Sequence, residues 1–183
     1  MFNAEEVSYL VGLIAAKSTE TCKVGFIVGT KSPIIESFEY WFLSGVESVG
    51  KNVKTLRQYA DTYTDAAKGK AIAKQMHNKD VDVIFIAAGS TGSGAIEAAR
   101  ENKKMAIGVD NVVYNNVKSL KEGNFKGGEV SVYGLKEDGV GIAPTTKNFV
   151  SEEILTFVEE KAEKIKSGDI IVPANKEEYN KLK

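Results

Sequence analysis

The pattern of apolar and polar positions predicts a chain that alternates between helices and strands. Residues 4–16 carry apolar side chains at helical spacing and predict an amphipathic helix. Residues 23–29 form a short apolar run that ends in glycine, which predicts a buried strand. Ser32 and Pro33 are then typical of the cap and the first position of a helix. The apolar face of that helix is predicted to consist of Ile34, Phe38, Trp41, Phe42, Val46 and Val49.

Two more strand–helix units follow at similar spacing. Residues 52–60 predict a strand, and residues 66–78 predict a helix capped by Thr64 or Asp65. Residues 81–88 are the most apolar run and predict a strand in the middle of a parallel sheet. Three such units in succession favour parallel strands joined by right-handed crossovers. The last helix and strand predicted for this part of the chain are residues 95–102 and 104–110.

The pattern changes after the fourth predicted strand. Residues 111–120 predict a helix, and residues 129–135 and 139–143 predict a hairpin. Residues 151–166 predict a long amphipathic helix, and the end of the chain predicts a short strand and a polar tail. The sequence therefore predicts an α/β protein with a doubly wound parallel sheet and a smaller mixed segment.

Composition and charge narrow the functional classes. The chain has 183 residues, 43% hydrophobic and 27% charged, which suits one globular domain or a domain with a short appendage. The 24 basic and 25 acidic residues give a net charge of -1 without a strongly basic block, which disfavours nucleic acid as a partner. One cysteine and one histidine cannot form a Cys/His zinc cluster, so no metal site is predicted.

The sequence shows none of the usual signals for membrane insertion, export or lipid attachment. No window reaches the roughly 18 continuous apolar residues that a membrane span needs. The amino-terminal residues lack the basic head of a signal peptide, and Cys22 does not follow an apolar run that would suit lipid attachment. From these features alone we expect a cytoplasmic location if the chain is the complete product.

A glycine-rich turn, AAGSTGSG, follows the most apolar strand. A phosphate-binding loop needs a lysine where Ala95 stands, and the dinucleotide fingerprint needs a small residue where Glu97 stands. What remains is a backbone that a ligand can approach closely, with helix-opening amides and the hydroxyls of Ser90 and Thr91 as donors. This favours a polar or partly anionic ligand atom. The alternative is that the glycines only form a tight strand-to-helix turn.

Parallel topology predicts where these residues meet. With the strand order 2-1-3-4, the order reverses between the first and third strands, so residues 30–38 and 89–92 should flank one cleft. Tyr63, Asp65 and Asp110 follow the other two strands and are also within possible reach. The alternative is that the acids cap helices and that Phe38 belongs to the core. Asp65 and Asp110 are conceivable as an acid–base pair, but no nucleophile motif accompanies them, and a binding role requires fewer assumptions.

Seven segments, in order, carry a family resemblance: EEVSYLVGLIAAKSTETCKVGFIVG, PIIESFEYWFLSGV, QYADTYTDAAKGKAIAKQM, DVIFIAAGSTGSGAIEAAR, AIGVD, FKGGEVSVYGLKEDGVGIAP and VEEKAEKIKSGDIIVP. Together they resemble the basic membrane protein (BMP) family of bacterial surface lipoproteins. Members of this family are substrate-binding proteins of ABC transporters, with purine nucleosides as the known ligand class. The resemblance implies a periplasmic-binding-protein fold of type I with two lobes, a transporter permease as partner, an extracytoplasmic location at the membrane, no cofactor and no catalysis.

The resemblance also assigns roles to individual residues. It implies that Phe38 stacks on the base and that the carboxylates of Asp65 and Asp110 accept hydrogen bonds from the sugar. It further implies that the glycine turn frames the ligand through Gly89, Ser90 and Gly92. Stacking together with acceptance from a ribose diol suits a neutral nucleoside.

Two departures from the family pattern shape the remaining expectations. The chain starts at a helix that family members carry after a signal peptide and the first half of the other lobe. After the GVD strand it also lacks the usual D-x-D-Q turn and a strand carrying a serine and a lysine. We therefore expect a truncated receptor with remnants of the second lobe. The predicted parts are 1–20, a helix of the incomplete first lobe, 21–122, the ligand-binding lobe, and 123–183, a hairpin and helix that return to the first lobe.

An exposed sheet edge is a further consequence of the missing strand, and such edges invite pairing with another chain, so self-association is expected. Two alternatives to a binding component remain open. One is an intracellular sensor, regulator or interaction protein that reuses the fold, and the other is a remnant without function. An enzyme that acts on nucleosides lacks an identifiable nucleophile or base.

Overall fold

The computed structural model describes residues 4–50, 52–108, 135–136, 141–142, 144–173 and 175–181. Four parallel strands lie in the order β2-β1-β3-β4, which confirms the predicted order. The described elements are α1 (Ala4–Ser18), β1 (Lys23–Val28), α2 (Pro33–Ser48), β2 (Lys54–Tyr59), α3 (Ala66–His77), β3 (Val83–Ala87), α4 (Gly89–Glu101), β4 (Met105–Gly108), a 3-10 turn (Pro144–Asn148), α6 (Glu152–Ser167) and α7 (Lys176–Lys181).

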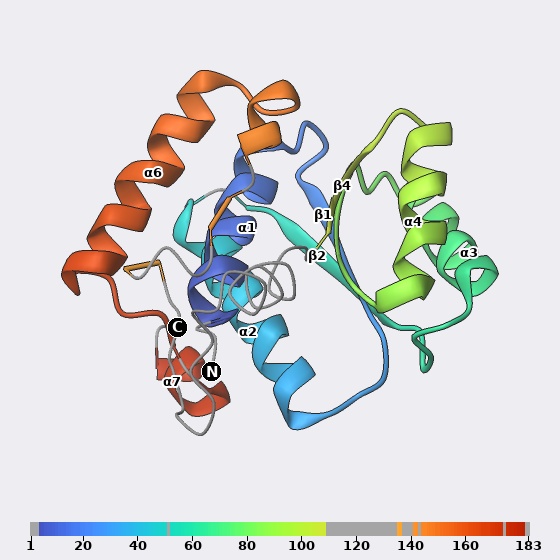
Figure 1. Cartoon of the computed structure of the whole chain (residues 1–183), viewed down its shortest axis with the longest axis horizontal. Coiled ribbons are helices and arrows are strands. Elements are labelled where there is room, and N and C mark those ends of the chain that lie inside the picture. Colours follow the sequence, from blue (N-terminus) through green and yellow to red (C-terminus); the bar gives the residue numbers. More distant parts are fainter. Residues whose placement is uncertain are drawn as a thin grey trace, which may run out of the picture.

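The sheet is covered by helices on both faces. Figure 1 shows α1 and α2 on one face, with α6 outside α1, and α3 and α4 side by side on the other face. Alternate residues of the strands point to the two faces, as the side-chain period of a strand requires. On the α1–α2 face, Phe26, Phe42 and Phe85 stack with ring centroids 5.3–5.5 Å apart. On the α3–α4 face, Ile84 and Ile86 pack against those two helices.

Helices α1 and α2 cross at a point where only glycine fits. A Cβ atom at Gly12 would lie 2.3 Å from the carbonyl oxygen of Phe42, and one at Gly45 would lie 2.1 Å from that of Tyr9. The backbones therefore pack in direct contact, and α1 is held against α2. The predicted division into parts 1–20, 21–122 and 123–183 stays a prediction.

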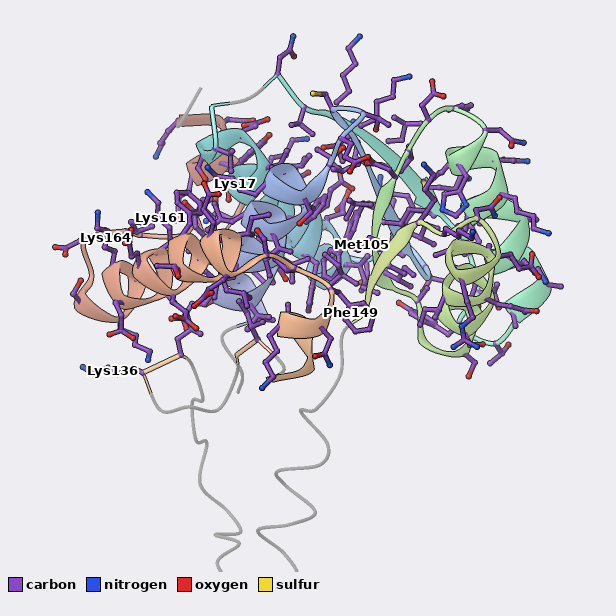
Figure 2. All side chains as sticks on the ribbon, turned by 90° about the horizontal axis from the view of Figure 1, so that it is seen from above. Lys17, Met105, Lys136, Phe149, Lys161 and Lys164 are labelled. Atoms are coloured by element: carbon purple, nitrogen blue, oxygen red, sulfur yellow. The ribbon has the colours of Figure 1, made fainter. Side chains whose placement is uncertain are left out.

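Helix α6 packs along α1 through apolar residues that include Val158 and Ile165. Each of these two helices places a lysine over the ring of Phe157, which belongs to α6. The ammonium groups of Lys17 and Lys161 lie 4.3 and 5.4 Å from the ring centroid. Figure 2 shows these two lysines beside each other at the α1–α6 contact. None of the described helices is both long and apolar enough to cross a membrane.

Two local predictions were wrong. Helix α4 begins at Gly89, six residues before the predicted start, because contacts with α3 rather than local propensity set its first turns. The polar tail contains the helix α7 and the stretch before it is not a strand. Asn175 accepts a hydrogen bond from the amide of Glu178. The ring of Tyr179 is buried and its hydroxyl donates to Glu47 at 2.6 Å, so α7 is held against α2. The helix predicted at 111–120 and most of the predicted hairpin lie outside the described residues.

Candidate functional site

A hollow of about 360 Å³ opens at the carboxyl ends of the strands, next to the point where the strand order reverses. Such crevices are where open parallel sheets bind ligands. Helix α2 contributes one lining residue, the end of β3 contributes two, the residue between β3 and α4 contributes one, α4 contributes four and β4 contributes one. These are Phe38, Ile86, Ala87, Ala88, Gly89, Gly92, Ser93, Ile96 and Gly108. The structure thus brings together Phe38, Gly89 and Gly92 of the predicted site.

Phe38 packs in the core and also lines the hollow, and its role in ligand binding stays a prediction. Its ring is half-buried and packs against core residues of both clusters on that side of the sheet. The Trp41 ring, with its centroid 5.1 Å away and tilted by 54°, holds it in place. The same Phe38 ring lines the hollow. Phe38 is therefore an aromatic wall fixed by core packing on one side and open to a ligand on the other.

The glycines of the turn have separate structural roles. Gly89 has a φ of +53°, in the left-handed region that favours glycine, and it turns the chain from β3 directly into α4. A Cβ atom at Gly92 would lie 2.7 Å from Cγ2 of Ile86, so a side chain there would fill the hollow. Ile96, one helical turn later and 43% exposed, forms the rim.

Gly69 and Gly94 serve the packing of α3 against α4. A Cβ atom at Gly94 would lie 1.8 Å from the carbonyl oxygen of Ala66, and one at Gly69 would lie 1.9 Å from that of Thr91. Part of the glycine-rich sequence is therefore explained by helix contact and not by ligand approach. This close crossing also fixes the first turn of α4 beside the hollow.

The expected hydroxyl donors are placed differently. The Thr91 side chain is fully buried; its hydroxyl donates to the carbonyl of Thr62 at 3.2 Å and accepts from the amide of Asp65 at 3.0 Å. The expectation that Thr91 offers its hydroxyl to a ligand is therefore wrong, because the hydroxyl joins the β2–α3 loop to α4. Ser90 is exposed and does not line the hollow, although its carbonyl accepts from the Ser93 hydroxyl at 2.7 Å.

Asp65 caps α3, as predicted: its carboxylate accepts a hydrogen bond from the amide of Lys68 at 2.9 Å. Its side chain is exposed at the carboxyl end of β2 and does not line the hollow. The assignment of Asp65 to ligand binding stays a prediction. Asp110 lies outside the described residues, so its role also stays a prediction.

Tyr63 lies at the same end of the sheet. Its ring covers Gly29, where a Cβ atom would come within 2.1 Å of the ring, and it remains 40% exposed. Its carbonyl accepts from the amide of Thr91 at 3.1 Å. An exposed aromatic face therefore lies close to the first turn of α4, as the position of Tyr63 after the second strand suggested.

Sequence reasoning missed six of the nine lining residues, namely Ile86, Ala87, Ala88, Ser93, Ile96 and Gly108. A signal for Ile96 exists, because Ile96 follows Gly92 by four residues and so lies on the same helical face. That signal becomes usable only when the helix is known to begin at Gly89. The lining includes no charged side chain among the described residues, and those residues also contain no group of three side chains able to hold a metal ion.

A second hollow of about 370 Å³ lies between α2, β2 and α7. Its buried carboxylate, Glu39, accepts hydrogen bonds from Arg57 at 2.5 Å and from the Tyr59 hydroxyl at 2.7 Å. Burial and then the bond to Glu39 raise the pKa of Tyr59 well above its usual range. Because this carboxylate is already engaged, and because the hollow lies away from the carboxyl ends of the strands, we regard the first hollow as the candidate site.

Comparison with known proteins identifies the family. A model described as Bmp, ABC transporter substrate-binding protein PnrA-like, matches residues 1–116 and 109–176. The chain belongs to the Bmp family. It is 35% identical to basic membrane protein A of Borreliella burgdorferi, over 99% of this chain and 60% of that protein. It is 37% identical to the CD4+ T-cell-stimulating antigen of Listeria monocytogenes, over 94% of this chain and 58% of that protein.

The Bmp chain spans about 60% of the length of the curated relatives it matches. Its alignment with basic membrane protein A covers 204 positions, more than the 183 residues of the chain. Part of the aligned relative therefore has no counterpart inside this chain. The two matched segments of the family model meet at residues 109–116, directly after β4.

Solved structures establish the fold of this Bmp chain as that of ABC solute-binding proteins. A solute-binding protein of an ABC transporter system from Aeropyrum pernix covers 100% of the chain with a TM-score of 0.76 and 24% identity. A second one, from Conexibacter woesei, covers 94% with a TM-score of 0.76 and 18% identity. A transcriptional activator of the comK gene from Bacillus halodurans covers 93% with a TM-score of 0.72 and 19% identity.

Proposed function

We propose that this chain is the ligand-binding part of an ABC importer component and that it binds a purine nucleoside without chemical change. The observation that carries the proposal is the uncharged hollow at the carboxyl ends of the strands, with the Phe38 ring as one wall. A volume of about 360 Å³ falls within the range of small-molecule pockets. The transporter permease is the proposed partner, and the proposed location is extracytoplasmic, at the membrane.

The lining supports a neutral, flat ligand. Aromatic rings and aliphatic side chains stack well on a planar base, and Phe38 and Ile96 lie on different helices that border the hollow. A phosphorylated ligand is disfavoured because no lysine or arginine lines the hollow in the described part of the chain. We assign the ribose hydroxyls to the carboxylates of Asp65 and Asp110, which follow β2 and β4 and accept hydrogen bonds when ionised.

The direct test is calorimetric titration of the purified chain with guanosine and inosine, with adenosine and uridine for comparison. Saturable binding that prefers purines supports the proposal. Replacing Phe38 with alanine should weaken the affinity by about 1–3 kcal/mol, because the ring would no longer stack on the base. The same change should lower the free energy of unfolding by only about 1–3 kcal/mol, less than a fully buried phenylalanine, because the ring is half-buried.

Phe149 provides the matched control. Its side chain is 75% exposed and is not part of the hollow, so Phe149→Ala should leave both affinity and stability nearly unchanged. If Phe38→Ala lowers stability yet binds purine nucleosides as tightly as the unchanged chain, the ring is a core residue and the proposed site is wrong.

A regulator or interaction protein is the second candidate. One neighbour that shares this fold is described as a transcriptional activator, so the fold occurs in proteins with that role. Flat heats with every nucleoside, from a chain that circular dichroism shows to be folded, would favour this candidate or a remnant without function. An enzymatic role is not proposed, because the lining of the hollow offers no nucleophile paired with a base.

We also propose self-association through the edge of β4. Within the described part of the chain, β4 pairs only with β3, so no described strand pairs with its other edge. The aligned relatives contain residues that have no counterpart in this chain, and the two matched family segments meet immediately after β4. A second copy of the chain can satisfy that edge by strand pairing.

A further inference from the structure

The end of the sheet opposite the hollow carries a cluster of lysines. Lys23 opens β1 and Lys54 opens β2, and the two residues are direct partners in the strand register. Lys79 lies between α3 and β3, and Lys103 and Lys104 lie between α4 and β4. We call these five residues the basic end. All but Lys23 are exposed, and Lys23 is partly so.

Hydrogen bonds and charge effects connect several of these residues. The ammonium group of Lys23 donates to the carbonyl of Lys79 at 3.1 Å and to the carboxylate of Asp80 at 2.9 Å. Burial lowers the pKa of the His77 imidazole, and the nearby charge of Lys104 lowers it further. The pKa of Asp80 is lowered first by its bond to Lys23 and also by the charge of Lys104.

Positive charge exceeds negative charge on this surface. The exposed carboxylates of the described segments there are those of Glu20, Glu47, Asp80 and Glu101. Glu101 is paired with Lys70 and Lys74, and Glu47 accepts a hydrogen bond from Tyr179. Asp80 already pairs with Lys23. The carboxylate of Asp82 is buried and accepts hydrogen bonds from Thr19 and from two backbone amides. The basic end is therefore positive, although the chain as a whole has a net charge of -1.

Helix capping explains only part of this cluster. Lysines near the carboxyl ends of α3 and α4 interact favourably with the helix dipoles, which accounts for Lys79, Lys103 and Lys104. Lys23 and Lys54 begin strands, where no such dipole favours a cation. Neither hollow includes any of the five lysines, so the surface has the character of an exposed cationic face and not of a phosphate pocket.

We propose that the basic end docks on a membrane surface rich in anionic phospholipids. Lysines on flexible stems attract a charged surface diffusely, without the bidentate geometry by which arginine recognises single phosphates. Each lysine within reach of an anionic leaflet strengthens binding by about fivefold. Because the hollow lies at the opposite ends of the same strands, docking in this orientation keeps the hollow facing away from the lipid. The proposal does not depend on which ligand the hollow binds.

The test is co-sedimentation of the whole chain with vesicles of phosphatidylcholine alone or with about 30% phosphatidylglycerol. We expect binding only to the anionic vesicles, and we expect binding to weaken at least about tenfold when salt rises from about 0.05 M to about 0.5 M. The quadruple variant K54Q/K79Q/K103Q/K104Q should also bind at least about tenfold more weakly. Lys23 is left in place because it pairs with Asp80.

The control variant has the same net charge as the quadruple variant of the basic end. K68Q/K147Q/K164Q/K181Q removes four exposed lysines from other parts of the surface and should bind anionic vesicles like the unchanged chain. Circular dichroism verifies that both variants fold. Equal losses in the two variants would mean that net charge alone matters, and this would overturn the proposal.

Two further measurements test whether a single phosphate group or an acidic protein, instead of a membrane, is the partner of the basic end. Glycerol phosphate at millimolar concentration should not compete with vesicles, and competition would indicate a site for single phosphates. Soluble polyglutamate tests an acidic protein as the partner. Binding to polyglutamate without binding to anionic vesicles would also overturn the membrane proposal.

Discussion

Asp82 is expected to hold together the amino end of the sheet. Its side chain is only 9% exposed, and its carboxylate accepts three hydrogen bonds. The Thr19 hydroxyl donates at 2.6 Å, and the amides of Glu20 and Thr21 donate at 2.8 and 3.0 Å. One carboxylate at the start of β3 therefore fixes the loop between α1 and β1. Replacing it removes a connection between segments about 60 residues apart in sequence.

The expected loss of stability follows from these bonds. Charge-assisted hydrogen bonds are roughly twice as strong as neutral ones, so Asp82→Asn, which keeps one acceptor oxygen, should lower the free energy of unfolding by about 2 kcal/mol. Asp82→Ala leaves all three donors without this acceptor and should cost about 4 kcal/mol. Asp169 is the control, because its carboxylate is exposed, and Asp169→Asn should change stability by less than about 0.5 kcal/mol.

The stabilisation should depend on pH in a defined direction. Burial alone would raise the pKa of Asp82, but the bonds from Thr19, Glu20 and Thr21 outweigh burial and lower it. A carboxylate whose pKa is lower in the folded state contributes stability that is fully present above the unfolded value, about 3.9. That contribution is lost as the pH falls through the folded value. The difference between the unchanged chain and Asp82→Asn should therefore shrink below about pH 4.

Urea unfolding followed by circular dichroism measures both effects. The unchanged chain, Asp82→Asn, Asp82→Ala and Asp169→Asn are compared at about pH 7, 5 and 3.5. The reasoning would be refuted by an asparagine variant as stable as the unchanged chain at pH 7. It would equally be refuted by a stability gap that stays constant down to pH 3.5.

Two further predictions concern helix contact and assembly. Gly94→Ala places a methyl group 1.8 Å from the carbonyl oxygen of Ala66 and should cost at least about 2 kcal/mol in urea unfolding, because α3 and α4 must separate. Gly141→Ala, where no described atom beyond the chain neighbours lies within 4 Å of the added carbon, should cost far less, and equal effects would contradict the helix-contact explanation. If the β4 edge pairs with a second copy, light scattering should show a mass that rises with concentration, whereas a constant monomer mass would rule such pairing out.

Local chemistry made parts of the fold predictable. Ser32 and Pro33 predict the start of α2, and in the structure the Ser32 hydroxyl accepts a hydrogen bond from the amide of Ile35 at 3.3 Å. Asp65 caps α3 in the same way. Such caps depend on residues within one helical turn, so they can be read without knowledge of the tertiary structure. The apolar run of β3 likewise indicated its central place in the sheet.

The start of α4 depends on distant residues and could not be predicted locally. Glycine and serine disfavour helix by intrinsic propensity, and four of the first six residues of α4 after Gly89 are of these types. Helix forms there because Gly94 lies against Ala66 and because the amide of Thr91 donates to the carbonyl of Tyr63. Because the predicted start of this helix was six residues too late, the sequence did not indicate that Ile96 lines the hollow. For the same reason the Thr91 hydroxyl was expected to be free to bind a ligand.

Parallel topology links the candidate site to the basic end. All four strands run in one direction, so α3 and α4 both begin near the carboxyl ends of the strands and both finish near the amino ends. The positive dipole end of α4 therefore lies at the hollow, and the negative ends of both helices favour the lysines that follow them. The same sheet thus separates an uncharged hollow from a cationic face by the full length of the strands. Measuring nucleoside affinity in the presence and absence of anionic vesicles tests this separation, because two independent ends should give the same affinity in both conditions.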